Sequence, residues 1–536
     1  MQQQFLERAK DLVGATGVAT VDTKPDLFCC TSGFASAQAA VFARSSAEVQ
    51  QLIALAKEHK IRLYPVSVGN NWGYGTRNPP RSDCVVLSLE RMDRILHFDH
   101  ELGLATLEPG VTQGALARFL DSRRVPFMVP TTGAGPKASI IGNLLERGFG
   151  ITPLADHFQS LMCLEAVLAD GSIYRSSLRS LGLGELAKVY KWGVGPYLDG
   201  LFAQGAFGVV TQATVALARR PEAVVALLFN VAGDNDLHNA AHVIQHVQSD
   251  LPGIIGGVNL MNARRVLAMT IPYPYQQTDE RGLIPQNLLE SLCKSRQIAP
   301  WTGLCTLYGP RQVVDAAARE IRSRLRAVAT RIVKVTPGRI RNALRLISMV
   351  PRLERRLGGS LRAVRSALEL ISGTPNETAL PLAYWKNRRK GDSVSGDLDP
   401  GRDGCGLIWY APLVEMRGAR VVEYVQWVSE TMLKHGIEPL ITLTSLSDRC
   451  FGSTIPVLFD TDDQSQVERA QQCYLSLLEG GYHRGFFPYR LGAYSMEWLL
   501  TRDPVYWARV GKIKDAVDPF GIISPGRYCP FQSGNE

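Results

Sequence analysis

The sequence predicts an α+β protein with more than one domain. Its 536 residues, of which 45% are apolar and 20% charged, are enough for two or three domains with a large buried core. Over residues 1–220 short strand patterns alternate with helix patterns, whereas from about residue 222 onward long helices separate the strands. The change of pattern at Pro221 predicts that a second domain begins there.

Individual elements can be assigned in order along the chain. Apolar residues recur on one side of residues 46–59, so a helix is expected there, with Ser45 or Ser46 as its N-cap. Asp170-Gly171 marks the turn of a β-hairpin. The other expected elements are strands at 61–68, 84–90, 103–108 and 207–221, the hairpin 162–178, a helix within 108–123, and long helices at 236–250, 310–326, 414–435 and 465–480.

The sequence gives no sign of export or of a membrane span. The first residues are polar and lead into an amphipathic helix, and no run of about 18 apolar residues is present. The ten cysteines include no Cys-x-x-Cys pair, which is typical of reduced, mostly buried thiols. A cytoplasmic location is therefore expected.

The net charge of +9 is concentrated in residues 334–371, where nine Lys or Arg face two Glu. Because the charge is local, nucleic acid is not an expected partner. Apolar residues follow the basic ones at helical spacing, interrupted by Pro351 and by Gly358-Gly359. Such a segment can lie on an anionic membrane surface, which would make the protein peripherally membrane-associated, or dock an acidic partner. It can also pack on its own domain or across a homodimer, and both alternatives stay open.

Three glycine-rich stretches point to one extended ligand. They cover residues 69–75, 133–150 and 192–208, each beside an expected strand or helix start, where backbone N–H groups can approach an anion. None of them fits Gly-x-Gly-x-x-Gly at the head of a βαβ unit, nor a P-loop. A Rossmann-type dinucleotide site is therefore disfavoured.

Five separated motifs, spread over nearly the whole chain, resemble one family. They are PVSVGNNWGYG (65–75), GNLLERGFGITPLADHF (142–158), GPYLDGLFAQGAFGVVT (195–211), GCGLIWYAP (404–412) and DPFGIISPGR (518–527). In this order they resemble the vanillyl-alcohol oxidase and 4-cresol dehydrogenase flavoproteins, which have the PCMH-type FAD-binding fold.

The resemblance implies a two-domain flavoprotein. A discontinuous, two-lobed FAD-binding domain would comprise residues 1–221 and 490–536, with an α/β substrate domain, or cap, inserted at 222–489. The basic segment 334–371 would be an insertion in the cap. The residues implied to bind FAD are Ser67, Gly69, Asn70, Asn71, Gly73, Gly142, Asn143, Gly205, Gly208, Val210 and Arg527.

The resemblance also implies the chemistry. In this family a tyrosine of a Gly-Tyr-Gly turn and a Tyr-Arg pair bind the phenolate oxygen of the substrate; here these are Tyr74, Tyr489 and Arg490. Holding a phenol of pKa ~10 as phenolate at pH 7 requires about 4 kcal/mol. Three charge-assisted donors at about 1.5–3 kcal/mol each can supply that. The expected reaction is FAD-dependent oxidation of a 4-alkylphenol or 4-hydroxybenzyl alcohol, with hydride passing from the benzylic carbon to flavin N5 through a p-quinone methide. O2 or a redox protein would accept the electrons.

Asp156 occupies the position at which the family has a carboxylate near flavin N5, where it could stabilise the intermediate or activate water. The alternative is an N-cap for the residues that follow. The residues alone favour the cap, whereas the resemblance implies the catalytic role, which is the one expected here.

The flavin is expected to be non-covalent. The positions that carry it covalently in the two branches of the family are Leu407 and Ala383 here, so Tyr384, one residue away, is the only covalent candidate. No metal is expected. His238, His242 and His246 share one helix face, but no carboxylate accompanies them at matching spacing.

Two other functions stay open at this point. The flavin could oxidise a 2-hydroxy acid or a lactone, in which case Arg490 would hold a carboxylate. The protein could also be a non-catalytic flavoprotein that docks on a membrane or a partner. Tyr74 and Tyr489 argue against the first alternative, and Asp156 argues against the second.

Overall fold

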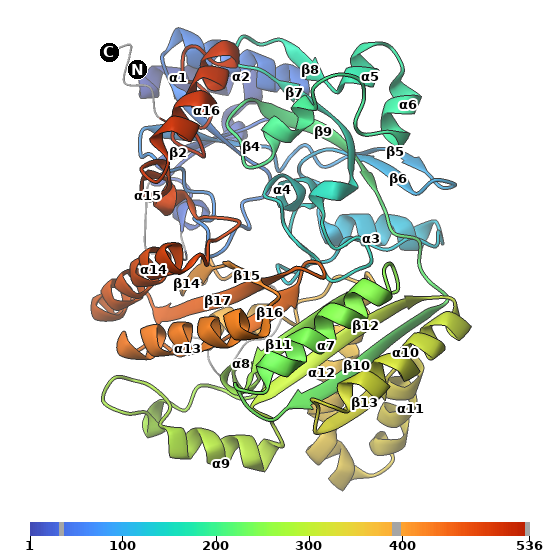
Figure 1. Ribbon diagram of the computed structural model, residues 1–536. Coiled ribbons are helices and arrows are strands. Elements are labelled where there is room, and N and C mark those ends of the chain that lie inside the picture. The colour runs from blue at the N-terminus through green and yellow to red at the C-terminus, as the bar shows by residue number, and fades with distance from the viewer. Residues whose placement is uncertain (30, 32–36, 388–397, 531–536) are drawn as a thin grey trace.

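Three β-sheets organise the chain. The computed structural model describes residues 1–29, 31, 37–387 and 398–530, and for residues 26, 351–353, 355–357 and 360 it describes the backbone only. The first two sheets are built from residues 18–216 and the third from residues 223–460 (Figure 1). The mixture of a partly parallel sheet, an antiparallel sheet and a helix-covered sheet confirms the α+β class.

The first sheet has the strand order β1-β2-β4-β3, with β2, β4 and β3 parallel and β1 antiparallel to β2. The C-terminal segment returns to this sheet: the Leu63 N–H donates to Ile522 O at 2.7 Å, and the Ser524 N–H donates to Leu63 O at 2.8 Å. In Figure 1 the red helices α15 and α16 lie at the same end of the molecule as the blue N-terminal elements. The elements are α1 (Gln2–Val13), β1 (Val18–Thr20), β2 (Ala39–Phe42), α2 (Ser46–Glu58), β3 (Arg62–Val66), β4 (Cys84–Ser88), α15 (Met496–Leu500) and α16 (Pro504–Val517).

The second sheet is antiparallel, in the order β5-β6-β9-β7-β8. The expected hairpin is present as β7 and β8, with Gly171 at φ 85° in its turn. The N-cap of α2 is Ser45, whose Oγ accepts from the Glu48 N–H. The elements are β5 (Ile95–Asp99), β6 (Leu104–Leu107), α3 (Gln113–Ser122), α4 (Ile140–Leu145), β7 (Leu161–Val167), β8 (Ile173–Arg175), α5 (Ser177–Ser180), α6 (Gly184–Val189) and β9 (Val209–Ala216).

The third sheet has the order β13-β10-β12-β11-β16-β17-β14, and β15 also pairs with β17. One expectation is corrected here: the helix expected at 414–435 begins at Gly418, because Leu413–Glu415 pair with β17 as a short strand. The elements are β10 (Ala223–Val231), α7 (Leu237–Asp250), β11 (Ile255–Asn262), α8 (Ala263–Ala268), α9 (Gln286–Arg296), β12 (Trp301–Gly309), α10 (Arg311–Leu325), β13 (Arg331–Val335), α11 (Pro337–Ser348), α12 (Pro351–Ile371), β14 (Cys405–Tyr410), β15 (Leu413–Glu415), α13 (Gly418–Lys434), β16 (Thr442–Ser445), β17 (Cys450–Asp460) and α14 (Gln464–Arg484).

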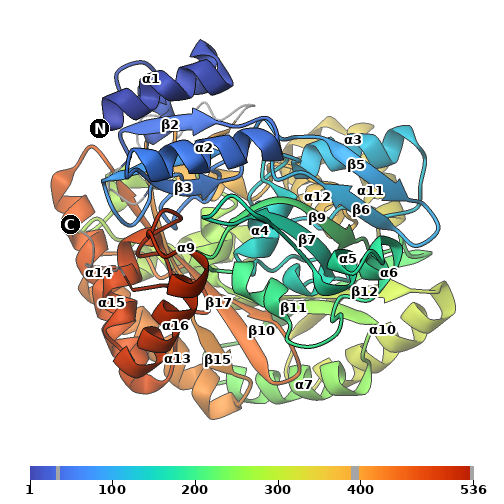
Figure 2. The same cartoon turned by 90° about the horizontal axis from the view of Figure 1, so that it is seen from above.

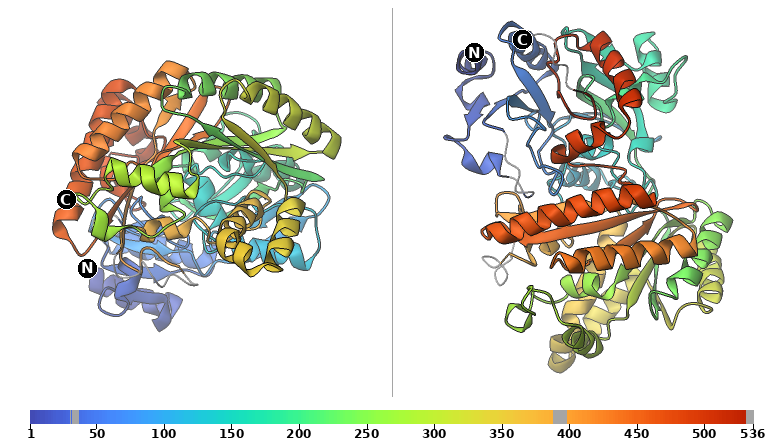
Figure 3. Two further views of the ribbon diagram at one scale, coloured as in Figure 1. Left: turned by 90° about the horizontal axis from the view of Figure 1, so that it is seen from below. Right: turned by 60° about the vertical axis from the view of Figure 1, so that its left-hand side comes forward.

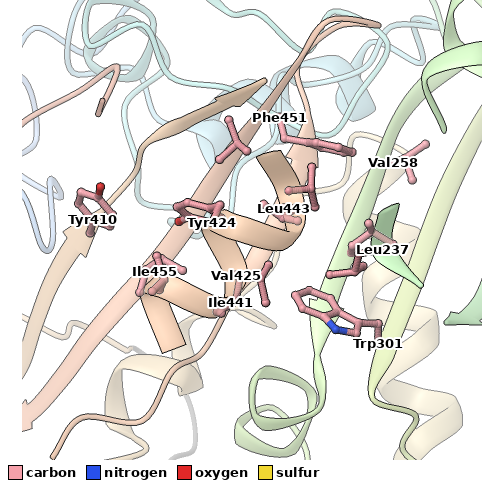
Figure 4. Close-up of a cluster of buried hydrophobic side chains, with 14 of the residues drawn as sticks. Leu237, Val258, Trp301, Tyr410, Tyr424, Val425, Ile441, Leu443, Phe451 and Ile455 are labelled. Carbon is pink, nitrogen blue, oxygen red and sulfur yellow. The ribbon is translucent and has the colours of Figure 1, made fainter. Parts of the chain in front are cut away.

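The two faces of the third sheet have different surroundings. Alternate residues of a strand point to opposite faces. One set, which includes Val258, Leu443 and Ile455, packs against α7, α10, α13 and α14 in the largest core (Figure 4). These helices lie along the outer side of the molecule in Figure 2, and α13 and α14 run along the sheet in the right panel of Figure 3. Their neighbours in sequence therefore face the opposite side of the sheet.

The α11–α12 hairpin covers part of that opposite side. Ile340, Leu368 and Ile371 are buried there together with Ala226 and Val335 of the sheet. The described apolar residues of the basic segment are thus used largely in packing on the protein's own third sheet. Binding of this segment to an anionic membrane stays a prediction. Among the described residues, no helix is long and apolar enough to cross a membrane.

A buried ion pair fixes the returning C-terminal segment. Lys514 Nζ donates to Asp518, to Ala206 O and, at 2.8 Å, to Ile523 O. The side chains of Lys514 and Asp518 are 4% and 0% exposed. One ammonium group thus joins α16 to the loop before β9 and to the strand-like segment beside β3.

We expect Lys514→Met to destabilise the protein by about 3–5 kcal/mol, because it leaves the buried Asp518 carboxylate without its cation. Thermal unfolding of Lys514→Met beside Lys512→Met, an exposed position of the same helix, measures the effect. Equal melting temperatures for the two variants would show that the pair does not hold the segment.

Candidate active site

A cavity of about 600 Å³ lies where the three sheets meet. Its walls come from the loop after β3, from α4 and β9, from the inner face of the third sheet, from α12 and from the C-terminal segment. A cavity of this size with a few convergent polar groups is the usual form of a ligand site.

The loop 67–73 presents unpaired backbone donors to the cavity. The N–H groups of residues 68–71 donate no hydrogen bond to any residue that the structure describes. Gly69 and Gly73 have φ of 77° and 75°, a region that favours glycine, and a Cβ on Gly73 would lie 2.3 Å from Trp409. Successive free N–H groups form an anion-binding concavity, so this loop fits the diphosphate of a dinucleotide.

Ten of the eleven residues expected to bind FAD contribute to the cavity wall. They are Ser67, Gly69, Asn70, Asn71, Gly142, Asn143, Gly205, Gly208, Val210 and Arg527. The eleventh, Gly73, packs behind the wall against Trp409. The backbone at Gly142 packs closely against Ser67, since a Cβ on Gly142 would lie 2.2 Å from Ser67 Oγ. The wall fits FAD, while the contact that each residue makes with it stays a prediction.

Tyr74, Tyr489 and Arg490 are brought together. The guanidinium carbon of Arg490 lies 4.2 Å from the centre of the Tyr74 ring. Burial raises the pKa of Tyr74 well above its ordinary value, and the nearby Tyr489 raises it further, while Arg490 opposes both. Tyr74 therefore keeps its proton at neutral pH and can donate a hydrogen bond. Tyr74 and Arg490 line the described cavity wall; Tyr489 is close enough to affect the pKa of Tyr74, and its ring lies edge-on to Phe149.

Glu146, at the end of α4, is a site residue that the sequence analysis missed. Arg527 Nη2 donates to both of its carboxylate oxygens at 2.8 Å, and Arg490 Nε lies 3.2 Å from Oε2. Burial alone would raise the pKa of Glu146, but the two guanidinium groups outweigh burial and hold the pKa below its usual range. Arg490 also donates to Asn71 Oδ1, which ties this network to the loop. The signal in the sequence was a single acid within the glycine-rich GNLLERGFG.

Asp156 is not part of the cavity wall that the structure describes. Its Oδ1 accepts from the Gln159 N–H at 3.2 Å, in the short 3-10 helix Phe158–Ser160, although the N-cap position of that helix is His157. This geometry agrees with the capping alternative. A role for Asp156 in the chemistry stays a prediction without support from the cavity wall.

The positions that could attach a flavin covalently carry no nucleophile. Ala383 and Leu407 both line the cavity. The Tyr384 hydroxyl donates to Asp403 Oδ2 at 2.7 Å, and Tyr384 is not part of the wall. Burial raises the pKa of Tyr384, as does its bond to Asp403, so the phenol stays protonated. These contacts favour a non-covalent flavin.

Arg265, on α8, is a third guanidinium in the wall, also missed from the sequence. It follows Arg264 on a short helix, a pattern that normally indicates a solvated face. Its Nε and Nη1 atoms are buried and have no hydrogen-bond partner among the described residues. Burial lowers its pKa to about 10, so the group remains a cation at neutral pH.

Comparison with known proteins agrees with this geometry. Residues 37–177 match the family described as FAD binding domain. The chain is 33% identical to 1'-carboxy-chondrochloren decarboxylase from Chondromyces crocatus over 98% of both proteins. It is 27% identical to the 4-cresol dehydrogenase [hydroxylating] flavoprotein subunit of Pseudomonas putida, over 91% of this chain and 87% of that protein. The crystal structure of p-cresol methylhydroxylase with substrate bound superposes with a TM-score of 0.87 at 24% identity, covering 100% of this chain and 98% of that one.

The relative from Chondromyces crocatus spans the whole chain at an identity that establishes kinship. The solved structure shares the fold from end to end. The loop 67–73 presents free N–H groups to the cavity, as a diphosphate site requires. The chain therefore belongs to the vanillyl-alcohol oxidase/4-cresol dehydrogenase family of FAD-dependent oxidoreductases, with the PCMH-type FAD-binding fold and FAD as its cofactor.

Proposed function

We propose that this oxidoreductase oxidises a para-substituted phenol at the benzylic carbon of the side chain. The observation that carries the proposal is the stack of Arg490 on Tyr74 in the cavity wall, with Tyr489 beside it. A neutral tyrosine and a guanidinium side by side provide a hydrogen-bond donor and a positive charge for one oxygen anion.

The charges around Arg490 support binding of the phenol as phenolate. Arg490 and Arg527 share the single carboxylate of Glu146, so this corner of the protein has one positive charge in excess. Interactions between charges are stronger in a buried site than in water, so an anion that reaches Arg490 is stabilised. Together with donors from Tyr74 and Tyr489 this can supply the roughly 4 kcal/mol needed to ionise a phenol at pH 7.

The chain's own residues hold and orient both reactants. The N–H groups of residues 68–71 would hold the diphosphate of FAD, which, when bound, accepts two electrons from the substrate. A phenolate at Arg490 directs its electron density to the para position, which eases loss of hydride from the benzylic carbon. The apolar wall residues Met261, Leu304 and Leu370 exclude water from the side chain of the substrate. The substrate leaves this step as a p-quinone methide.

Two fates of the quinone methide are consistent with the relatives' names. Water can add to the benzylic carbon, as the word hydroxylating implies for the cresol relative. If the carbon beside the benzylic carbon bears a carboxylate, the bond between that carbon and the carboxylate can break instead. The electron pair of that bond then re-forms the aromatic phenolate with a new C=C bond, and CO2 leaves. The unpartnered cation Arg265 favours this second fate, and so does the decarboxylase name of the other relative.

Removing one phenolate donor should slow the oxidation. We expect Tyr74→Phe and Tyr489→Phe each to lower the rate of anaerobic flavin reduction by a 4-alkylphenol about 10- to 150-fold at neutral pH, the equivalent of one charge-assisted hydrogen bond. Arg490→Lys should also be slow, because an ammonium group lacks the planar fork that reaches both Glu146 and the substrate. Stopped-flow absorbance of the flavin measures all three.

Tyr506→Phe, at an exposed position, is the matched control and should behave as wild type. The 4-methoxy analogue of a good substrate cannot form a phenolate and should leave the flavin oxidised. Rapid reduction by this ether would refute the phenolate mechanism, and so would full activity of Tyr74→Phe.

The flavin should be released by acid precipitation, because Ala383 and Leu407 offer no nucleophile. Absorbance of the supernatant after precipitation measures the released fraction. Tyr384→Phe should release the same amount as wild type. Flavin that stays in the wild-type pellet and leaves the Tyr384→Phe pellet would identify Tyr384 as the point of attachment.

A further inference from the structure

Arg265 is a buried cation whose partner is missing from the protein. Its neighbour Arg264 shows how this chain normally treats such a group: Arg264 Nη1 donates to Glu438, and both Nη1 and Nη2 donate to Ile284 O at 3.2 Å. Arg265 Nε and Nη1 have no acceptor among the described residues, although both atoms are buried. A buried, unpaired charge is strongly unfavourable, so such groups normally mark a ligand site.

The surroundings of Arg265 are polar on one side. Thr442 lies opposite Met261 in the pairing of β16 with β11, close to the start of α8, and its buried Oγ1 atom also lacks a partner. Thr444 and Asn259, the next pair on the same face of the sheet, are joined by a 2.6 Å hydrogen bond. All four residues line the cavity. An unpaired hydroxyl and an unpaired guanidinium in the wall of one cavity suit an anion with more than one oxygen.

The backbone around Arg265 is held firmly. The Asn262 side chain caps α8 by accepting from the Arg265 N–H at 3.0 Å. Asn262 also donates to Pro439 O at 2.8 Å and accepts from the Ile441 N–H at 3.1 Å. This amide therefore ties the first turn of α8 to the segment that leads into Thr442. The two unpaired groups are thus preorganised on one rigid piece of the third sheet.

The charges of the cavity wall also favour an anion at Arg265. The described wall contains three guanidinium groups, those of Arg265, Arg490 and Arg527, but the single carboxylate of Glu146. Glu146 contacts Arg490 and Arg527 and is assigned no contact with Arg265. The part of the cavity wall formed by α8 therefore has a positive charge that no carboxylate of the described wall balances.

We propose that Arg265, with Thr442, binds a carboxylate on the side chain of the substrate, so that the substrate class is a para-substituted phenol that carries an acid group. This inference rests on the proposed oxidation of phenols and adds its specificity. Arg490 receives the phenolate end of the molecule and Arg265 the carboxylate end. A planar guanidinium and a carboxylate match in geometry and form the stronger kind of hydrogen bond.

The test compares an acid with its amide of nearly the same shape. The substrates are 3-(4-hydroxyphenyl)propanoate and 3-(4-hydroxyphenyl)propanamide, given to the purified holoenzyme. We expect wild type to prefer the acid, and Arg265→Met to lower the acid-to-amide ratio of kcat/KM about 10- to 150-fold, the loss of one charge-assisted contact. Arg265→Lys should restore part of the preference. Arg296→Met, at an exposed position on α9, should keep the wild-type ratio.

A second measurement does not depend on turnover. The 4-methoxy acid should raise the melting temperature of wild type more than the 4-methoxy amide does, by mass action on the folded state. That difference should disappear in Arg265→Met. The ratio of flavin to protein absorbance after gel filtration should be equal in both proteins, because the proposal places Arg265 against substrate and not against FAD.

The outcomes separate the two proposals. If no phenol reduces the flavin, the proposed function fails, and the melting experiment with the methoxy pair still decides the role of Arg265. If phenols are oxidised but the acid-to-amide ratio is the same in wild type and Arg265→Met, the carboxylate site is refuted. Loss of flavin from Arg265→Met would show that the guanidinium binds the cofactor, and this outcome would also refute the carboxylate site.

Discussion

The carboxylate of Glu146 between two guanidinium groups is the interaction on which the site depends. Glu146 ends a helix of the second sheet's lobe, Arg490 follows the last long helix of the third sheet, and Arg527 lies in the C-terminal segment that returns to the first sheet. Any one of these charges, left alone in the interior, would cost several kcal/mol. All three parts of the fold must therefore close on one another before the charges are satisfied. Because Arg490 also bonds to Asn71, the same closure sets the position of the loop 67–73.

The third sheet supplies the other half of the site through simple alternation. Val258, Leu443 and Ile455 face the helices and form the core, so their neighbours Asn259, Thr442 and Thr454 must face the cavity. A shift of one residue in any pairing would exchange the two sets and bury threonine and asparagine in the core. The register that stabilises the third sheet is thus the same register that places polar groups in the cavity wall.

The cofactor half of the site could be predicted from the sequence, whereas much of the substrate half could not. Glycines at 69 and 73 are required by backbone geometry, and such requirements are local and visible in a short stretch. The partners of Arg490 and the isolation of Arg265 arise only when strands from distant parts of the chain come together, so no local pattern announces them. Asp156 shows that one short motif can fit two roles: its surroundings suit a catalytic carboxylate and a helix cap, its Oδ1 accepts from the Gln159 N–H, and its role in the chemistry stays a prediction. The helix expected from residue 414 erred for a related reason, since Val414 is apolar in either state and only pairing with Phe451 makes it a strand.

Charge, more than shape, limits what this cavity can accept. A neutral hydrocarbon could fill its apolar parts, but it would leave the excess positive charge at Arg490 unbalanced and would cover Arg265 without offering it an acceptor, which deepens the desolvation of both. A ligand with one anionic oxygen satisfies one end, and a ligand with an anionic group at each end satisfies both. Each cation of the cavity wall also favours ionisation of an acid nearby, because charges interact strongly in a buried site. In the proposed reaction, the ionised form of a phenol would therefore be stabilised by the whole set of wall charges, and the residues that touch its oxygen would supply only a part of that stabilisation.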